Sequence, residues 1–204
     1  WSAPSDDCAR AGGGGSVAAM TPYQFSYGPK FLSGGGAVRR VGGILPPGPT
    51  LFVTDGPILS LGLAGAALEA LDGAGIEPVV FDAVEQDPSR DTLMTAVDLG
   101  LARGCVSIVG FGGGSPMDVA KLAAYLIGSG DDLDTLWGVD KALGQRLPLV
   151  LIPTTAGTGS EATPVAVITV GGAEKKGVSS RALVADWAIL DAELTLGLPR
   201  PVTA

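Results

Sequence analysis

The chain contains no histidine. That absence excludes a Ser-His-Asp triad, and any metal site with histidine ligands, from these 204 residues. It also removes the side chain that most often carries a proton near neutral pH. Hydrolysis by a triad and catalysis at a histidine-ligated metal are therefore not expected from this chain.

Positive charge is also scarce. Lys and Arg together number 13 against 21 Asp and Glu, which gives a formal net charge of -8. No basic stripe is available to neutralise phosphates, so we expect no nucleic-acid partner. No apolar run is long enough to span a bilayer, so we expect no membrane partner either.

Cysteine is rare as well. The chain has two cysteines, Cys8 and Cys105. Cys105 directly precedes an apolar run, and a small core residue is a better interpretation of it than a disulfide partner. The default location for a chain that uses cysteine in this way is the reducing cytoplasm.

Apolar residues and glycine, in contrast, are abundant. Hydrophobic residues make up 46% of the chain, charged residues 17%, and there are 32 glycines. This composition is typical of a globular chain with a core and many tight turns. Residues 1–19 include four consecutive glycines at 12–15 and have the composition of a flexible linker. We therefore expect 1–19 to be an upstream or added extension without fixed structure, and 20–204 to be the folded domain, with Met20 as its natural start.

Apolar runs alternate with helical periodicity along the rest of the chain. The runs predict strands at 23–27, 51–54, 76–81, 106–111, 149–152 and 188–190. Helices are predicted between them, and two sets of residues form their inner faces: Leu61, Ala64, Leu68 and Leu71, and Leu93, Ala96, Val97, Gly100 and Leu101. Residues 165–179 predict a hairpin with Gly171-Gly172 near its turn. This order predicts an α/β fold, a mainly parallel sheet with helices on both faces plus a β-hairpin.

The stretch 106–127 contains a candidate ligand site. Its strand is followed by three glycines, Gly112 to Gly114, and then by a helix. Ser115 suits the N-cap, Pro116 the first helical position, and Asp118 the acidic position of a capping box. Free N–H groups and the positive end of a helix dipole, at the carboxyl edge of a parallel sheet, form a site for phosphate. An ordinary glycine turn that binds nothing is the alternative.

The loop 153–164 is a second candidate. Six of its residues carry a hydroxyl or a carboxylate, and two are glycines. Such a loop can wrap a polar ligand, although a solvated loop rich in turn formers has the same composition. Lys175 and Lys176 on the returning hairpin strand either form a solvated face or place one ammonium near a nucleotide.

Four segments in order carry a family resemblance: Gly-Gly-Gly-Ser-Pro-Met-Asp at 112–118, Pro-Thr-Thr-Ala-Gly-Thr-Gly-Ser-Glu at 153–161, Glu-Lys-Lys-Gly at 174–177, and Asp-Ala-Glu-Leu-Thr at 191–195. With them the chain resembles the iron-containing (group III) alcohol dehydrogenases, from about Tyr23 to Ala204. The resemblance implies a Rossmann-like, dinucleotide-binding α/β domain that is truncated before the family's C-terminal helical, metal-binding domain. The chain departs from the family at Gln86-Asp87-Pro88, where Pro-Asn-Pro is common.

The resemblance also implies roles for particular residues. Its pyrophosphate site is expected at Gly113, Gly114 and Ser115, with Asp118 close by. The remaining expected cofactor contacts are Thr154, Thr155, Thr158, Thr163 and Lys176, together with Asp55 at the adenosine ribose. Since a carboxylate repels a 2′-phosphate and accepts from a 2′-hydroxyl, the expected cofactor is NAD and not NADP.

No catalytic or metal-binding residue is expected in this chain. The family's metal ligands are one Asp and three His, and neither Asp186 nor Asp191 corresponds to that Asp. Fe²⁺ or another divalent metal is thus expected in a longer parent protein, with ligands outside this sequence.

Two functions follow from the resemblance. The first is the cofactor-binding portion of an NAD-dependent, metal-dependent alcohol dehydrogenase that interconverts an alcohol and an aldehyde or ketone. The second is an NAD-binding fragment with no activity of its own. An enzyme like the maleylacetate reductases, glycerol dehydrogenases or dehydroquinate synthases is a further alternative. The expected partners are a small alcohol or aldehyde substrate and further copies of the chain, in a homodimer or larger homo-oligomer.

Overall fold

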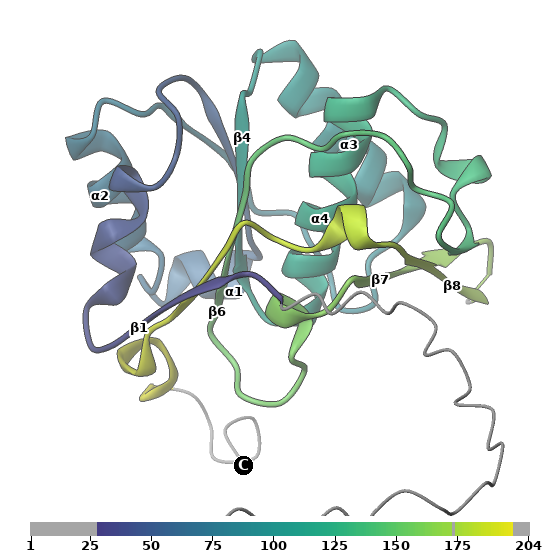
Figure 1. The fold of residues 1–204 in the computed structure, drawn as a ribbon. Helices are drawn as coiled ribbons and strands as arrows, with labels where there is room; N and C mark the ends of the chain where they lie inside the picture. Colours follow the sequence, from purple (N-terminus) through teal and green to yellow (C-terminus); the bar gives the residue numbers. More distant parts are fainter. Residues whose placement is uncertain (1–27, 173, 198–204) are drawn as a thin grey trace, which may run out of the picture.

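The computed structural model describes residues 28–172 and 174–197, which form an α/β fold around a six-stranded sheet (Figure 1). The strand order is β1-β9-β6-β4-β2-β3, and every neighbouring pair is parallel. The strands are β1 (Lys30–Ser33), β2 (Thr50–Val53), β3 (Pro78–Phe81), β4 (Ser107–Gly112), β6 (Leu149–Pro153) and β9 (Trp187–Leu190). The predicted parallel sheet is confirmed. The strand expected at 23–27 and the extension 1–19 lie outside the described residues.

Helices cover both faces of this sheet (Figure 1). One face carries α2 (Gly65–Gly73) and the 3-10 helix η1 (Ala37–Gly43), and the other carries α3 (Arg90–Ala102) and α4 (Gly114–Ser129). Successive strand residues pack into opposite layers: Ile108 lies in the core under α4, and Val109 in the core under α2. Strands buried on both faces need apolar residues at every position, which explains the continuous apolar runs in the sequence.

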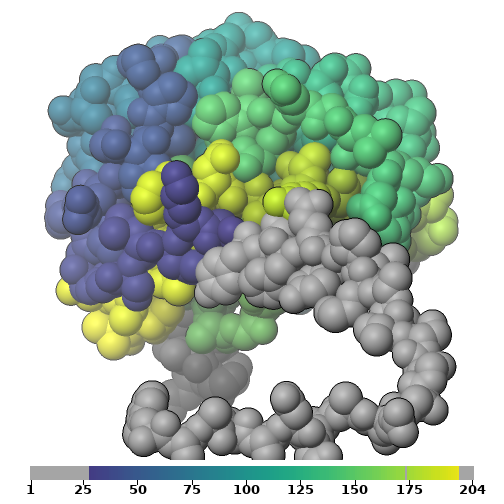
Figure 2. Space-filling view, in the orientation of Figure 1, coloured from purple at the N-terminus to yellow at the C-terminus, as the bar shows by residue number. Residues whose placement is uncertain are grey.

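The chain begins and ends its described part on adjacent strands. Edge strand β1 pairs with β9, so that Lys30 lies opposite Trp187 and Ser33 opposite Leu190. In the space-filling view the purple start and the yellow end accordingly lie side by side on one face (Figure 2). Strand β1 falls in a glycine-rich region where the sequence gives no clear strand pattern, and pairing with β9 is what orders it.

A second, smaller sheet covers the outer side of α4. Strands β7 (Val165–Val170) and β8 (Glu174–Ser179) form an antiparallel hairpin, and β5 (Gly138–Val139) adds to β8 in parallel. The turn uses positive φ angles of 43° at Gly171 and 71° at Gly172. The predicted hairpin is confirmed. Because the hairpin covers the side of α4 away from the main sheet, α4 is buried almost all round.

The helix expected after residue 57 is two helices. The short α1 (Gly56–Ser60) ends before Gly62, which has a left-handed φ of 71°, and α2 begins at Gly65. Leu61 therefore does not join the inner face, and its exposed fraction is 66%, whereas Ala64 and Leu71 are buried. In α3 the expected face is likewise correct except at its end, where Leu101 is 57% exposed.

Two further expectations can be compared with the described residues. Within 28–172 and 174–197, no helix combines the length and apolar character needed to cross a membrane. Cys105 is buried, as expected for a small core residue. The remaining short elements are 3-10 helices: η2 (Leu133–Thr135), η3 (Ser160–Ala162), η4 (Arg181–Leu183) and η5 (Ala192–Thr195).

Gly110→Ala is expected to lower the free energy of unfolding by about 1–3 kcal/mol, the range for overpacking a tight core. A Cβ at Gly110 would lie 2.7 Å from both Ala120 Cβ and Leu151 Cδ2, because α4 crosses β4 at this point. Urea unfolding measures the change. Gly73→Ala is the matched control, since a Cβ there meets nothing within 4 Å, and it should change stability by less than about 1 kcal/mol. Equal effects of the two substitutions would contradict the close crossing.

Candidate functional site

The site lies where the order of the sheet reverses. From β2 the chain runs to β3 on one side, and α3 returns it to β4 on the other side of β2. Connections that leave neighbouring parallel strands in opposite directions open a crevice at the carboxyl ends, which is where α/β sheets bind ligands. Three segments meet there: Asp55 after β2, Gly113 to Ser115 after β4, and Thr154 with Thr155 after β6.

The first turn of α4 faces this crevice without a capping side chain. Its N-cap is Gly113 and not Ser115, and no side chain bonds to the cap. Ser115 is already the second helical residue, and the Asp118 carboxylate is engaged elsewhere, so the expected capping box is wrong. The first amides of a helix have no partner inside it. The N–H groups of Gly114 and Ser115 are consequently available to an anion.

Two cavities flank this turn and share Gly114 and Ser115. The first, here named the Asp55 cavity, has a volume of about 440 Å³ and is also lined by Gly113, Thr154 and Thr155. The second, the Asp118 cavity, has a volume of about 460 Å³, and Thr158, Ser160, Thr163 and Val165 line it with Asp118. A ligand seated on the first turn of α4 can thus extend in both directions.

Three buried hydroxyls near the turn lack a partner. Among the described residues, the Oγ1 atoms of Thr54, Thr154 and Thr155 are buried side-chain atoms that make no hydrogen bond. Thr154 is fully buried, and both it and Thr155 line the Asp55 cavity. Buried polar atoms are nearly always satisfied in folded proteins, so these three hydroxyls leave hydrogen-bonding capacity that a polar ligand or an ordered water can use.

Carboxylates and apolar side chains share the Asp55 cavity. Asp55 is the N-cap of α1, and its Oδ1 accepts a hydrogen bond from Ile58 N at 2.8 Å. Glu85 lies across the cavity. Burial alone would raise the pKa of Glu85, but hydrogen bonds from Ser89 N and the Thr92 hydroxyl outweigh burial and lower that pKa. Glu85 is thus charged at neutral pH. Both carboxylates lie beside an apolar wall formed by Pro57, Ile58, Leu61 and Val84.

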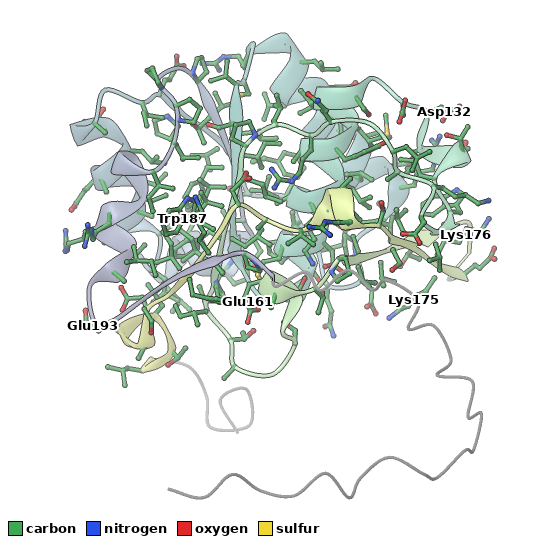
Figure 3. The ribbon with its side chains drawn as sticks, in the orientation of Figure 1. Asp132, Glu161, Lys175, Lys176, Trp187 and Glu193 are labelled. Carbon is green, nitrogen blue, oxygen red and sulfur yellow. The ribbon has the colours of Figure 1, made fainter. Side chains whose placement is uncertain are left out.

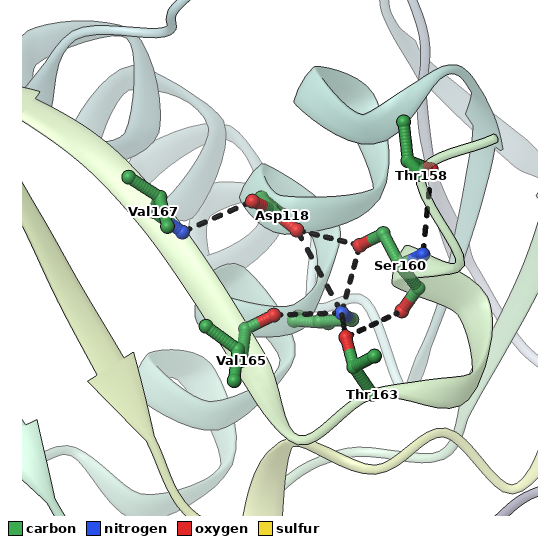
Figure 4. Close-up of polar contacts among 7 residues, drawn as sticks. Asp118, Thr158, Ser160, Thr163, Val165 and Val167 are labelled. Carbon is green, nitrogen blue, oxygen red and sulfur yellow. Dashed lines mark hydrogen bonds and ion pairs between the residues drawn. The ribbon is translucent and has the colours of Figure 1, made fainter.

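An ion pair joins Asp118, which lines the Asp118 cavity, to the buried Lys121 on the next turn of α4 (Figure 4). Lys121 is fully buried, and its Nζ lies 3.7 Å from Asp118 Oδ1 and 2.8 Å from Ser160 Oγ. The Ser160 hydroxyl donates to Asp118 Oδ1 at 2.6 Å, and Val167 N donates to Oδ2 at 3.0 Å. Burial raises the pKa of Asp118 against the charge of Lys121. Burial also lowers the pKa of Lys121 to about 8 against the charge of Asp118.

The hairpin lysines lie on opposite faces of β8 (Figure 3). Lys176, the expected cofactor contact, is not brought to either cavity, since its Nζ lies 5.9 Å from the centre of the Trp137 ring. Lys175 instead lines the Asp118 cavity and pairs with Asp87 Oδ1 at 2.6 Å. Side chains of neighbouring strand residues point to opposite faces, so only one of the two can reach the site.

A family model described as iron-containing alcohol dehydrogenase matches residues 28–192. The chain belongs to this family. Among curated relatives, the sulfoacetaldehyde reductase of Bilophila wadsworthia (strain 3_1_6) is 39% identical over 180 residues, which are 86% of this chain and 46% of the relative. The chain thus spans about half the length of the curated relatives it matches.

Solved structures of the family have the same fold. A 1,3-propanediol oxidoreductase superposes with a TM-score of 0.84 at 31% identity, over 89% of this chain and 49% of that one. A sulfoacetaldehyde reductase from Bifidobacterium kashiwanohense, solved in complex with NAD+, superposes with a TM-score of 0.76 at 28% identity, again over 89% of this chain and 49% of that one. The resemblance inferred from the four sequence motifs is therefore confirmed.

The family name implies iron, but the described residues do not form an iron site. Within 28–172 and 174–197, no group of three His, Cys, Asp or Glu side chains could hold a metal ion. Asp191 accepts from the backbone N–H groups of Gly36 and Val38, and Asp186 accepts from Leu149 N and Arg146. These two carboxylates hold strands and turns together.

Sequence reasoning missed three residues of the site. Thr54 belongs to Val53-Thr54-Asp55, a segment that also fits the family resemblance, but its place at the strand end gives it no role of its own. Ser160 was only one of several hydroxyls in its loop. Lys121 did have a signal, because it is the only charged residue between Asp118 and Asp131 on a helix that is otherwise apolar or small. A single lysine in such a run either buries its ammonium group among hydrogen-bond acceptors or extends its aliphatic side chain so that the ammonium reaches solvent.

Lys121 is expected to make the stability of the chain rise with pH. Its pKa is about 8 in the folded chain and roughly 10.4 when unfolded. Between these values the unfolded chain binds more protons, so the contribution of Lys121 to the free energy of unfolding increases with pH. Urea unfolding of wild type and Lys121→Met, from about pH 7 to pH 10, measures this. The difference in stability should grow in favour of wild type.

Cys105 and Tyr125 cancel in that comparison, whereas Asp118 does not. Removing the charge of Lys121 raises the pKa of Asp118 further, and this adds to the same trend because a raised carboxyl pKa makes the variant less stable as the pH rises. Burial raises the pKa values of Cys105 and Tyr125, and both groups are present in the two proteins. A stability difference that stays constant over the whole range would mean that the Lys121 pKa is not depressed.

Proposed function

We propose that the described residues bind NAD(H) in the crevice between β2 and β4, as the cofactor-binding part of a protein that interconverts an alcohol and an aldehyde or ketone. One observation carries the proposal. Thr154, whose buried hydroxyl has no partner, lines a cavity together with the uncapped first turn of a 16-residue helix. A family member solved with NAD+ shares the fold.

The diphosphate fits on the first turn of α4. The amides of Gly114 and Ser115 and the positive end of the helix dipole provide donors and favourable potential for an anion. Gly114 has no side chain to intrude, and a Cβ there would already lie 3.2 Å from Thr158 Cγ2. Gly112 has a φ of 145°, which lets the chain turn sharply from β4 into the helix. The backbone of this turn therefore leaves space for the diphosphate, here named the diphosphate seat, and an ordinary side chain would fill that space.

The adenosine half fits the Asp55 cavity. Its apolar wall, which includes the exposed Leu61, suits the faces of an adenine ring. The charged groups of Asp55 and Glu85 accept from ribose hydroxyls and repel a 2′-phosphate, so we assign NAD over NADP. The nicotinamide half then extends into the Asp118 cavity, past Thr158 and Thr163.

The described residues bind and orient the cofactor. When bound, the nicotinamide ring supplies the acceptor or donor of hydride. The amides of Gly114 and Ser115 fix the middle of the dinucleotide, and the two cavities fix its ends. No step of the alcohol chemistry is assigned to these residues. The activity of the whole protein is a proposal that rests on the family, because the chain spans about half of its relatives.

Gly114→Val is expected to abolish NADH binding, because a branched side chain occupies the position of the diphosphate. The titration follows NADH fluorescence on the 204-residue chain. Gly43→Val is the control, since a Cβ at Gly43 meets nothing within 4 Å and lines neither cavity. Unchanged affinity in Gly114→Val would move the cofactor elsewhere.

Asp55→Asn is expected to reduce the preference for NADH over NADPH by about tenfold or more. The substitution removes the repulsion between the carboxylate and a 2′-phosphate, and a repulsion of roughly 1.4 kcal/mol corresponds to a tenfold difference in affinity. Asparagine is as good an N-cap as aspartate, so the bond from Ile58 N and helix α1 are retained. Competitive titration with the two cofactors measures the preference. Wild type that binds both equally well would overturn the assignment of NAD.

A further inference from the structure

We propose that Lys121 is a positioning residue that fixes the wall of the Asp118 cavity, and through it the nicotinamide half of the dinucleotide. This inference rests on the proposed function and deepens it. Lys121 touches no ligand itself, since its side chain has no exposed surface and lines neither cavity.

The ammonium ties α4 to the segment that forms the wall. Lys121 Nζ donates to Ser160 Oγ and to the carbonyl oxygen of Val165, both at 2.8 Å, and to Thr163 Oγ1 at 3.4 Å (Figure 4). Ser160 belongs to η3, and Val165 begins β7. All three acceptors are on residues that line the Asp118 cavity. One buried group thus holds the whole connection between η3 and β7.

Asp118 completes the attachment one turn earlier on the same helix. Its Oδ2 accepts from Val167 N at 3.0 Å, and its Oδ1 accepts from the Ser160 hydroxyl at 2.6 Å. The distance between the diphosphate seat and the cavity wall is therefore set within one rigid helix. The seat is the start of α4, and the wall is fastened to α4 at Asp118 and Lys121.

Packing alone does not account for a lysine at this position. Removing an ammonium from water is costly, and an apolar side chain of the same length often serves a buried site equally well or better. Lysine adds directed bonds to three acceptors, which an apolar side chain cannot replace. Those bonds specify where the loop and β7 lie, and a binding site whose supporting groups shift by even an ångström loses affinity.

The test compares two ligands on the 204-residue chain. ADP needs only the Asp55 cavity and the diphosphate seat, whereas NADH also needs the Asp118 cavity. Lys121→Met should raise the dissociation constant of NADH about tenfold or more while that of ADP stays within about twofold. Equal weakening of both ligands, or an unchanged NADH constant, would overturn the inference.

Tyr125→Phe is the matched control. Tyr125 is fully buried on the same helix, and its hydroxyl bonds to Asp131 and to Gly144 N, yet it lines neither cavity. Its replacement removes a buried polar group from α4 and should leave both constants unchanged. If Tyr125→Phe changed the ratio of the NADH and ADP dissociation constants, the loss of any buried polar group from α4 would be enough to produce the effect.

A second pair of variants covers the case in which Lys121→Met does not fold. Lys121→Met combined with Asp118→Asn leaves no unpaired buried charge, and Asp118→Asn alone is its reference. The double variant should bind NADH about tenfold more weakly than that reference, with ADP unchanged. If wild type binds neither ligand, the proposed function fails; if wild type binds both and each comparison shows no selective loss, only the role of Lys121 fails.

Discussion

The close crossing of α4 over β4 is the constraint on which the site depends. Gly110 lacks a side chain at the crossing, and a Cβ there would overlap Ala120 and Leu151. The helix therefore rests on the strand through small groups, and its first turn is held directly beyond the end of β4. Amides that receive an anion help most when they are already in place, and dense packing limits how far they move.

The burial of α4 explains why its polar groups have such different roles. The start of the helix leaves its amides open to the crevice, whereas the next turn lies beneath the β7–β8 hairpin and has to satisfy Asp118 and Lys121 internally. Burial favours the neutral form of both groups, so it raises the pKa of Asp118 and lowers the pKa of Lys121. Their other partners lie in η3, in β7 and, at Thr163, in the link between the two, so the hairpin and the helix form one polar unit on the outer side of the main sheet.

Much of the fold followed from local pattern. Strands buried on both faces leave continuous apolar runs, and β4, β6 and β9 were found in this way. Strand β1 was not found, because its order comes from pairing with β9 across the chain. The break between α1 and α2 depends on one positive φ at Gly62, which an otherwise helical periodicity conceals.

The site was less accessible to sequence reasoning. The glycines after β4 and the threonines after β6 carry their own local signal, and the structure brings both to one cavity. The prediction of Ser115 as the N-cap was wrong for a physical reason. The Asp118 carboxylate, which would complete a capping box with Ser115, is instead hydrogen-bonded to a distant loop and strand. Lys176 is not brought to either cavity, because tertiary packing places it on the same face of β8 as the buried Val178, whereas Lys175 lies on the opposite face and lines the Asp118 cavity. The cofactor contact expected of Lys176 stays a prediction.

The seat on α4 contains no cation. Among the described residues that line the two cavities, only Lys175 is positively charged, and Asp87 already neutralises it. On the proposed function, a protein of net charge -8 would receive the diphosphate through aligned dipoles and hydroxyls and not through formal counter-charge. Dissolved ions act on such a seat in two opposing ways, since they screen the helix dipole that attracts a doubly negative group and also the negative charge of the chain that repels it.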